Sequence, residues 1–444
     1  MKKSFIILAL FVGIVLCQAI AIYPAAAQEE GSEVAIQELE NQADVPKKEE
    51  NKGANLRLEL TKIVYYLQTE DVQKAFEMLD ELREESGSEP AFVAAEAEAY
   101  FHVGNWRKGL ALVREAKMID PQNETYRDRA DGVIKENGPM AFVEHEVKYT
   151  GDVATERFTR LRAQTVYKEF HKIGLFYDFN DASISQVRRA NGSLGRFDKT
   201  IGKGELFYEH MFENGHHGKM SLHFGNRIVG LGGQYNWVNM FGRTTVELDL
   251  HQPNWDFLEN VAGHGTRDRL KLTRFQRLAP RLTATGHIAG TRYGNEADDH
   301  LVSTSGFGGI VTYRLKPYST VKKIFGDGAV VSVNYTLDSE TSHEVATRFD
   351  SAGAAFNPLG SSSREIDLAN LSLSKDFIKE LRFDGFAGFA FDRMSGTKSP
   401  SATGILAYKP TKEVEAQLKA SYSMSLENTA NVLNILGANL KWKF

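Results

Sequence analysis

Apolar and polar residues alternate along the carboxy-terminal end of the chain. Within residues 431–444, an apolar residue occupies every second position from residue 436 onward, and polar residues lie between most of them. The apolar series is Leu436, Ala438, Leu440, Trp442 and Phe444. A period of two places the two sets on opposite faces of a β-strand. The stretch therefore predicts a closing strand with one apolar face.

The same alternation recurs in many segments between residue 142 and the carboxyl end. We predict strands over residues 142–149, 159–165, 173–179, 205–212, 219–224, 228–235, 242–250, 269–278, 281–293, 303–315, 329–337, 365–374, 381–393, 402–408 and 413–426, followed by the closing strand. The count is about 16, and many segments approach the ~10 residues that a tilted membrane strand needs. We therefore predict that residues 139–444 form an antiparallel transmembrane β-barrel.

The links between these segments are short at one end of the strands and long at the other. Short links are predicted around Lys168, Asn214-Gly215, Ala279-Pro280, Lys375-Asp376 and Lys409-Pro410. Long links are predicted over residues 181–204, 251–268 and 338–364, and the link 316–327 is a longer exception at the short-link end. Outer-membrane barrels have short periplasmic turns and longer external loops. The short-link end is therefore predicted to be periplasmic.

Charged residues occupy the second face of the predicted strands. The candidate lumen-lining residues are Glu144, Glu146, Arg160, Arg162, Asp178, Glu205, Glu209, Arg243, Glu247 and Asp249. So many charges on one wall exclude an apolar core, because burying unpaired charge is costly. A barrel of about 16 strands leaves an aqueous channel. We therefore predict a water-filled lumen.

Upstream of the strands, residues 55–138 show the apolar period of helices. One apolar stripe comprises Leu56, Leu60, Ile63, Val64 and Leu67, and the next comprises Val72, Ala75, Phe76, Leu79 and Leu82. A second helix pair is predicted over residues 92–103 and 106–119, and a capping helix over residues 124–136. The predicted fold class is thus a short α-helical domain followed by a transmembrane β-barrel.

The two helix pairs align at an offset of about 34 residues, the period of tetratricopeptide repeats. At that offset Ala75 matches Gly109, and a small residue there lets two helices approach closely. Residues 118–123 resemble a repeat boundary of that family. The resemblance implies a periplasmic platform that docks another protein. Packing between helices is the simpler explanation for Tyr66 and Tyr100.

The first 27 residues have the composition of a secretory signal peptide. Two lysines precede an almost wholly apolar run over residues 5–22, and Ala25-Ala26-Ala27 supplies a small-residue cleavage site. We predict cleavage near Ala27, with a signal anchor as the alternative because the apolar run is long. Residues 28–54 are polar and rich in Glu, which predicts an acidic flexible linker.

Composition narrows the class of partner. The formal net charge is −5 and the basic residues are dispersed, which argues against a nucleic-acid partner. The mean hydropathy of −0.35 argues against helical membrane spans but is compatible with alternating barrel strands. The single cysteine, Cys17, lies in the predicted leader, so the mature chain is predicted to form no disulfide.

No constellation of residues nominates a catalytic or metal site. The pair His216-His217 lies on a predicted turn, and a zinc site usually needs at least three protein ligands. His251, His264 and His300 fall in predicted outer loops. The sequence contains no His-x-x-x-His helix, Gly-x-Ser-x-Gly elbow or glycine-rich phosphate loop. We therefore predict no enzyme activity, no metal and no cofactor.

One segment has helical spacing inside the strand-rich region. It runs from Trp255 and Asp256 through Glu259 to Arg267 and Asp268. A capped loop helix and a lid or constriction at the channel mouth explain it equally well.

The closing residues Leu440, Trp442 and Phe444 resemble the assembly signal of bacterial outer-membrane β-barrel proteins. This resemblance implies recognition by the barrel-assembly machinery and contact with outer-membrane lipid. A signal peptide, tetratricopeptide repeats and a barrel of this size together resemble exopolysaccharide export porins. That group includes the exporters of Pel polysaccharide, poly-N-acetylglucosamine and bacterial cellulose. The stretch from Trp255 to Arg292-Tyr293 is most similar to the barrel of the Pel exporter.

The family resemblance implies passive export of a secreted biofilm polysaccharide. It also implies that the repeats dock periplasmic or inner-membrane proteins of polymer synthesis and modification, although this chain has fewer repeats than those exporters. Two alternatives stay open from the sequence. One is a general diffusion or uptake porin with a periplasmic docking module, and the other is an outer-membrane lipid hydrolase.

Overall fold

The computed structural model describes residues 50–189, 192–225, 227–296, 298–315, 326, 328–350, 352–356, 363–424 and 432–444. The predicted signal peptide, with Cys17, lies outside the described residues, as does most of the predicted linker. The first described helix begins at Glu50, inside the stretch that was expected to be linker.

Five helices precede the first strand of the sheet. They are α3 (Glu50–Gln68), α4 (Val72–Ser86), α5 (Pro90–Val103), α6 (Trp106–Ile119) and α7 (Glu124–Asn137). Gly104 ends α5 with a φ of 90°, a left-handed conformation that glycine adopts without strain. Asn105 then caps α6, because its side chain accepts a hydrogen bond from the backbone N–H of Lys108. The predicted helical region is confirmed.

The helices pack where the sequence offers small residues. Ala97, Leu110, Val113 and Ala130 form a buried cluster between α5, α6 and α7. At Gly109 a Cβ atom would lie 2.5 Å from the Phe101 ring, so only glycine permits this approach. Among the described residues, no helix combines the length and apolar character needed to cross a bilayer.

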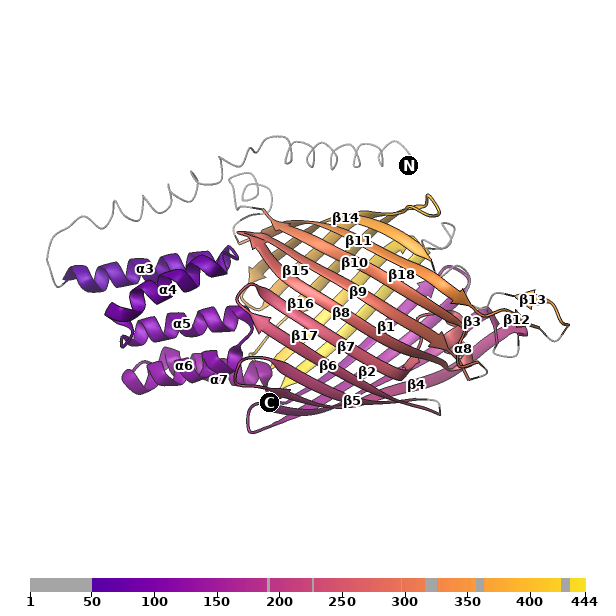
Figure 1. Ribbon diagram of the computed structural model, residues 1–444, viewed down its shortest axis with the longest axis horizontal. Coiled ribbons are helices and arrows are strands. Elements are labelled where there is room, and N and C mark those ends of the chain that lie inside the picture. Colours follow the sequence, from indigo (N-terminus) through magenta and orange to yellow (C-terminus); the bar gives the residue numbers. More distant parts are fainter. Residues whose placement is uncertain are drawn as a thin grey trace. The chain divides into compact units, whose positions relative to one another are not determined.

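After the helices, most strands of the chain pair into a single closed antiparallel barrel (Figure 1). Its members are β1 (Met140–Thr150), β2 (Ala154–Tyr167), β3 (His171–Arg188), β4 (Leu194–Met211), β5 (His217–Gly225), β6 (Ile228–Asn239), β7 (Gly242–Asn254), β8 (Gly265–Ala279), β9 (Leu282–Gly294), β10 (Val302–Arg314), β11 (Val330–Val345), β14 (Arg364–Ile378), β15 (Leu381–Asp392), β16 (Lys398–Tyr408), β17 (Val414–Met424) and β18 (Val432–Lys443). A small separate hairpin, β12 (Arg348–Phe349) with β13 (Ala355–Phe356), lies in the link between β11 and β14. The predicted barrel of about 16 strands is confirmed.

Closure occurs between the first and last barrel strands. The Cα partners of β1 run from Met140 opposite Lys443 to Thr150 opposite Leu433, so the closing strand pairs with β1 over all but its first residue. A closed sheet has no edge, and every backbone polar group in it finds a partner.

Directly paired residues share a face of the sheet, so the register separates the two walls. Val143 is paired with both Leu161 and Leu440, and these side chains are 48%, 40% and 50% exposed. Apolar side chains with such exposure recur around the whole barrel. The outer wall is therefore apolar, the reverse of a water-soluble sheet packed on a core.

Two expectations about links were wrong. Residues 181–204, expected to be a long link, continue β3 and β4 as a paired ribbon as far as Arg188 and Leu194. In that stretch apolar residues such as Ile184 and Phe197 pack in a buried cluster instead of continuing the exposed apolar row, so the pattern used to predict the strands stops there. The link placed at Lys375-Asp376 is also displaced: β14 continues to Ile378, and the turn falls at Lys379-Glu380.

The ends of the helices contact the short-turn end of the barrel. Arg107 of α6 donates a 2.8 Å hydrogen bond to the Met211 carbonyl oxygen, and Lys135 of α7 forms a 2.6 Å ion pair with Glu413. Glu70, which lies between α3 and α4, accepts a 2.8 Å hydrogen bond from Arg277. These contacts reach the turns after β4, β16 and β8, which lie at separate points around the barrel.

Candidate lumen and constriction site

The structure places the ten candidate lumen residues on the inner face of the barrel. Glu144, Arg160, Asp178 and Lys203 are Cα partners in a row across β1 to β4, on the face opposite Val143 and Leu161. Arg160 lies 2.8 Å from Glu144 and 3.5 Å from Glu146, and Arg162 forms an ion pair with Asp178. These charges therefore neutralise one another along the wall.

The other acidic members of the set also have cationic partners on neighbouring strands. Lys219 lies 2.5 Å from Glu205, and Lys172 lies 3.6 Å from Glu209. Arg269 lies 3.6 Å from Glu247 and 3.3 Å from Asp249. Arg243 is exposed near the short-turn end, where it is paired with Val238.

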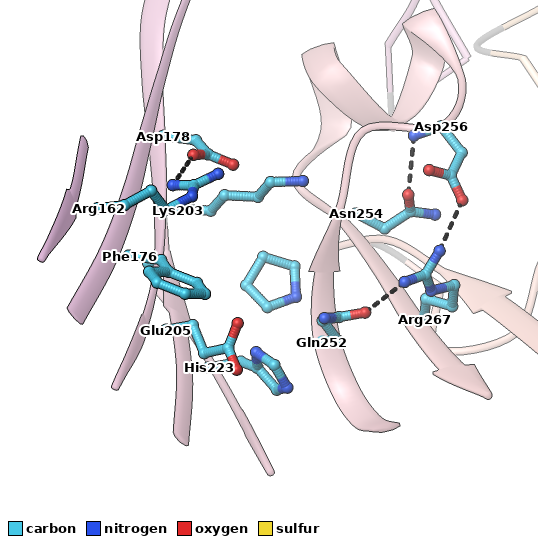
Figure 2. A pocket seen from close by; sticks show the side chains of 12 residues that line it. Arg162, Phe176, Asp178, Lys203, Glu205, His223, Gln252, Asn254, Asp256 and Arg267 are labelled. Carbon is cyan, nitrogen blue, oxygen red and sulfur yellow. Dashed lines mark hydrogen bonds and ion pairs between the residues drawn. The ribbon is translucent and has the colours of Figure 1, made fainter. Parts of the chain in front are cut away.

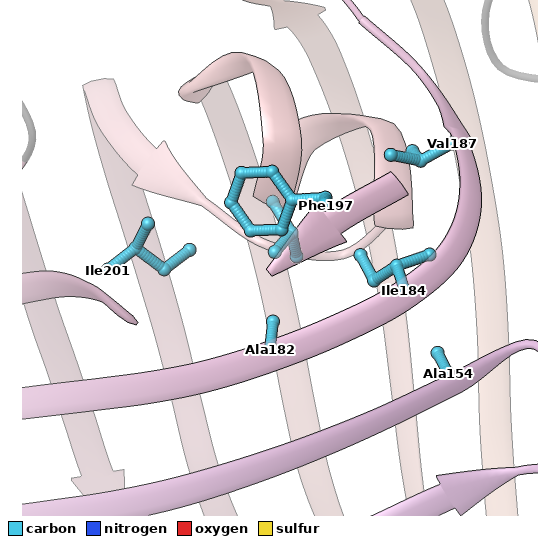
Figure 3. Packing of buried hydrophobic residues seen from close by; sticks show 7 residues of the cluster. Ala154, Ala182, Ile184, Val187, Phe197 and Ile201 are labelled. Carbon is cyan, nitrogen blue, oxygen red and sulfur yellow. The ribbon is translucent and has the colours of Figure 1, made fainter. Parts of the chain in front are cut away.

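The segment with helical spacing folds inside the barrel. It contains α8 (Leu258–Gly263), which follows β7 but packs against β2, β3 and β4. Val261 is fully buried in a cluster with Ile184 and Phe197 (Figure 3). β5 and β6 separate β4 from β7 around the wall, so the segment crosses part of the lumen. The mouth opposite the short turns is therefore narrowed.

Trp255 begins this crossing. Its ring lies 6.4 Å from that of Phe158 on β2, and the Nζ of Lys203 lies 4.4 Å from its ring centre. Such an aromatic side chain under a lysine is a favourable cation–π arrangement. The segment is thus attached to the far wall by an aromatic anchor as well as by the apolar cluster.

A buried ion pair fixes the end of the segment. Glu259 Oε1 lies 2.5 Å from Arg348 Nη1, and Arg348 Nε lies 3.0 Å from Asp298. Burial raises the pKa of Glu259 above its ordinary value, although the Arg348 guanidinium opposes this shift. The contact joins three links at one end of the barrel: those after β7, β9 and β11.

The five candidate lid residues do not all lie in the segment. Asp256 and Glu259 do, but Arg267 and Asp268 lie on β8. Arg267 bonds Asp256 at 3.0 Å and so braces the segment from the strand. Asp268 instead accepts a 2.6 Å hydrogen bond from the backbone N–H of His251 at a bulge in the β7–β8 pairing. Asp268 was therefore misplaced, because the strand begins earlier than expected.

A polar cavity of about 180 Å³ lies between the inner wall and this segment (Figure 2). Its lining comprises Arg162, Phe176, Asp178, Lys203, Gly204, Glu205, His223, Gln252, Pro253, Asn254, Asp256 and Arg267. Phe176 offers an aromatic face, while carboxylate, amide and guanidinium groups surround it. This combination suits a ligand with one apolar face and hydroxyl groups at its edge.

Two deeply buried side chains line this cavity: His223 is 4% exposed and Asn254 is 2% exposed. His223 Nε2 lies 3.5 Å from Asp249 Oδ1, so the imidazole faces a carboxylate. Gly232 makes room for the imidazole, since a Cβ there would lie 2.5 Å from His223 Nε2. Within the described residues, Asn254 Nδ2 has no hydrogen-bond partner. Buried polar atoms are nearly always bonded, so this amide group points to a guest molecule or water.

Sequence reasoning did not select Lys203, His223 or Asn254. The register explains this: Glu205 lies opposite His223, and Asp178 lies opposite Lys203. Alternation along β5 would have placed His223 on the lumen face. Lys203 and Asn254 could not be placed in this way, because both lay in stretches expected to be links. Asn254 reaches the cavity because β7 continues beyond the bulge after Asp249 and pairs there with β8.

The closing residues Leu440 and Trp442 lie on the apolar outer wall, and the rings of Trp442 and Phe444 stack with their centres 5.6 Å apart. Within the described ranges, no group of three or more His, Cys, Asp or Glu side chains is arranged to hold a metal ion. His216 Nδ1 instead lies 3.1 Å from the Tyr235 hydroxyl group.

Comparison with solved structures found several likenesses at low sequence identity. A structure described as a bacterial polysaccharide outer membrane secretin matches 69% of this chain and 99% of that chain, with 11% identity and a TM-score of 0.48. The outer membrane channel DcaP of Acinetobacter baumannii matches 69% of this chain and 96% of that chain, with 13% identity and a TM-score of 0.34. Pseudomonas putida OprB matches 72% and 96%, with 10% identity and a TM-score of 0.38.

These likenesses concern the fold alone and carry no argument about what this chain transports. No protein-family model and no curated protein sequence matches the chain.

Proposed function

We propose that the protein is an outer-membrane porin that exports a secreted polysaccharide passively through its water-filled lumen. The observation that carries this proposal is the inner wall. Charged, hydroxyl and amide side chains line most of it. The segment after β7 narrows the lumen beside a cavity that combines Phe176 with an amide group of Asn254 that has no partner within the described residues. A polar wall with a narrowing suits a hydrated chain that slides past weak contacts.

The outer wall supports the membrane location. Exposed apolar side chains cover it, and water would penalise such a surface at roughly 25 cal/mol for each Å². Tyr167, Tyr208, Trp237 and Tyr408 are exposed close to the short-turn end. Aromatic belts of this kind lie at the level of lipid headgroups.

The lumen contacts suit sugars in two ways. Phe176 in the cavity and Phe386 on the inner face of β15 present aromatic faces, and Phe386 keeps 42% of its surface exposed. Hydroxyl and amide side chains supply hydrogen bonds that exchange readily with water. The polymer would thus be guided without being held, while its synthesis supplies the push.

In this proposal the helices dock proteins of polymer synthesis or modification. Their ends contact several turns of the barrel, so a protein held on them would lie beside the channel entrance. The predicted tetratricopeptide character of the helices remains the basis for the partner class.

The test is reversible blockage of export in living cells. A deletion strain is complemented with the Phe386→Cys variant, and surface polysaccharide is measured before and after a bulky thiol-reactive sugar analogue is added. The only natural cysteine is Cys17, in the predicted leader, so the mature variant would carry one thiol. Export should stop on labelling and resume after reduction. Leu371→Cys, on the outer wall, is the matched control and should continue to export.

Unchanged polysaccharide in the deletion strain would overturn the export proposal. The alternative is an uptake porin for small sugars, which the cavity of about 180 Å³ favours because its size suits one sugar unit. Single-channel currents blocked by monosaccharides, together with normal surface polysaccharide in the deletion strain, would support that alternative.

The structure offers little support for a lipid hydrolase. His300 Nε2 lies 2.9 Å from Ser303 Oγ and 3.6 Å from Glu344. A catalytic base must contact the nucleophile with one ring nitrogen and the orienting acid with the other. Here a single nitrogen faces both groups, so the arrangement does not form a relay.

A further inference from the structure

A second cavity lies on the outer wall, where α6 meets the turns after β2 and β4. It has a volume of about 640 Å³ and is lined by Arg107, Lys168, Phe170, His171, His210, Phe212, Glu213 and Asn214. His171 and His210 are Cα partners and share the outer face with Ile173 and Tyr208. The cavity therefore opens outside the barrel and is separate from the lumen.

The cations of this cavity are positioned by their surroundings. Arg107 Cζ lies 4.3 Å from the centre of the Phe170 ring, and Nη1 donates a 2.8 Å hydrogen bond to the Met211 carbonyl oxygen. Its other amino group lies 3.3 Å from Glu213, which is exposed. A guanidinium has five N–H donors, so donors remain for a ligand. Lys168 is exposed on the neighbouring turn, 5.2 Å from the Tyr167 ring centre.

The charges in the cavity favour a phosphate ester. Two permanent cations face one carboxylate, that of Glu213, before the histidines are considered. The rings of His171 and His210 lie 4.3 Å apart, and His171 Nδ1 lies 2.7 Å from the Tyr208 hydroxyl group. Arginine forms strong, directional hydrogen bonds with phosphate oxygens. An anion with several acceptor oxygens therefore fits this set.

The position of the cavity identifies the source of the phosphate. Phe212 lines it, and the rings of Tyr167 and Tyr208 lie 6.2 Å and 6.0 Å from that of His171, another lining residue. All three aromatic side chains are exposed at the short-turn end. That belt marks headgroup level, and the apolar wall with Ile173 and Leu175 begins immediately beyond it. A lipid could place its phosphate in the cavity and its acyl chains along this wall.

We propose that this cavity binds a phospholipid of the periplasmic leaflet, with the phosphate held between Arg107 and Lys168. The inference rests on the outer-membrane location in the proposed function. Arg107 belongs to the helical region, whereas Lys168 and His171 belong to the barrel. The bound lipid would thus bridge the helical region and the barrel, and it would stabilise the contact between α6 and the barrel rim.

The test is native mass spectrometry of the full-length mature protein, purified in detergent and supplied with defined lipids. The probes are palmitoyl-oleoyl phosphatidylethanolamine, palmitoyl-oleoyl phosphatidylglycerol and the corresponding diacylglycerol, which lacks phosphate. Arg107→Gln and Lys168→Gln should each weaken binding of the two phospholipids by about tenfold, the equivalent of one charged hydrogen bond. Lys379→Gln removes an exposed turn lysine elsewhere on the same rim and should bind as the wild type does.

Two outcomes would overturn the inference. One is equal retention of diacylglycerol and phospholipid, and the other is equal phospholipid binding by the wild type and Lys168→Gln. In the described part of the chain no hydrogen bond or ion pair joins the Lys168 side chain to α6, so that variant tests binding even if Arg107→Gln disturbs the helix. Displacement of the lipid by millimolar inorganic phosphate would assign the site to free phosphate and also overturn it.

The lipid inference and the proposed function fail in different ways. Flotation of cell membranes first establishes whether the protein is in the outer membrane. Absence from that fraction would defeat the proposed function. Presence there with phosphate-independent lipid binding would defeat only this inference.

Discussion

Two parts of the barrel wall present different chemistry to the lumen. From β1 to β8 the inner face carries ladders of paired charges, such as Arg160 with Glu144 and Arg269 with Asp249. On β9–β11 and β14–β16 the inner rows consist mainly of small hydroxyl, amide and glycine residues. Asn334 and Asn370 hydrogen-bond at 2.7 Å in that region. We refer to these as the charged wall (β1–β8) and the neutral wall (β9–β11 with β14–β16).

The loop segment containing α8 lies against the charged wall. Its apolar cluster and its aromatic anchor contact β2, β3 and β4, and its cavity faces β2 to β5. The charges beneath it are already paired with one another, so they present little net charge to a passing polymer. The neutral wall, with Phe386, supplies exchangeable contacts. We therefore expect an exported polymer to pass along the neutral wall and to carry little charge.

The largest effect is expected from releasing the segment from the charged wall. In the double variant Leu258→Asp and Val261→Asp, two carboxylates would replace apolar side chains of the buried cluster. Unpaired buried charge costs several kcal/mol, so the segment should dissociate from β2, β3 and β4. Single-channel conductance in planar bilayers should rise severalfold, with the barrel strands intact by circular dichroism.

Asp299→Asn provides the control for this experiment, because Asp299 is exposed in the neighbouring link, between β9 and β10. Its conductance should equal that of the wild type. A folded double variant with unchanged conductance would show that the segment does not narrow the channel.

A smaller effect is expected from Arg348→Gln, which leaves Glu259 buried without its partner. Removing one member of a buried ion pair costs about 3–5 kcal/mol. Burial raises the pKa of Glu259 when the segment is packed against the wall, so the packed state binds the carboxyl proton more tightly than the dissociated state does. Lowering the pH through this raised pKa should therefore return the segment of the variant to its packed position.

The measurement is conductance of Arg348→Gln between about pH 8 and about pH 5, a range that spans a raised carboxyl pKa. The conductance should be high at the higher pH and should fall toward the wild-type level at the lower pH. The double variant Arg348→Gln with Glu259→Gln has no charge to neutralise, so its conductance should not follow pH. A pH response that persists in the double variant would assign the titration to another group.

A third prediction concerns the boundary between the two walls, the β8–β9 turn. Burial disfavours ionisation of Glu70, but hydrogen bonds from His102 and Arg277 outweigh it and hold its pKa at about 2. Because the native pKa lies below the unfolded value, this contact stabilises the native state above about pH 4.5 and is lost as the pH falls toward 2. The contribution at neutral pH is about 2–3 kcal/mol.

Limited proteolysis of the helices at neutral pH tests this contact. Glu70→Gln should expose the helices to cleavage while the barrel stays resistant. Asp80→Asn changes an exposed carboxylate of α4 and should leave the helices protected. Equal cleavage of Glu70→Gln and the wild type would indicate that the contact does not anchor the helical region.

The difference between the walls also shows what the sequence can and cannot predict. Alternation identified the lipid-facing strands, because a bilayer outside and water inside impose opposite demands on successive residues. It failed for residues 181–204, where apolar residues such as Ile184 and Phe197 pack against the loop segment instead of continuing the outer row. The cavity could not be predicted, because the pairing of Glu205 with His223 depends on strand register. The helical spacing that begins at Trp255 predicted a helix but not the wall on which it packs.

The smallest effect is expected from adding one negative charge to each wall. Val238→Glu introduces a carboxylate on the charged wall opposite Arg243, whose guanidinium group can neutralise it. Thr403→Glu introduces a carboxylate on the neutral wall, where its Cα partners are Phe386 and Ser421. An unpaired lumen charge attracts counterions, whereas a paired one has little effect at a distance. Cation selectivity, measured from reversal potentials in a salt gradient, should therefore shift more for Thr403→Glu. The shift should shrink as ionic strength rises, since the Debye length falls to about 3 Å at 1 M salt. Equal shifts for the two variants would mean that the charges of β1–β8 are not neutralised within their own wall. The contrast between the charged wall and the neutral wall would then have no electrostatic basis.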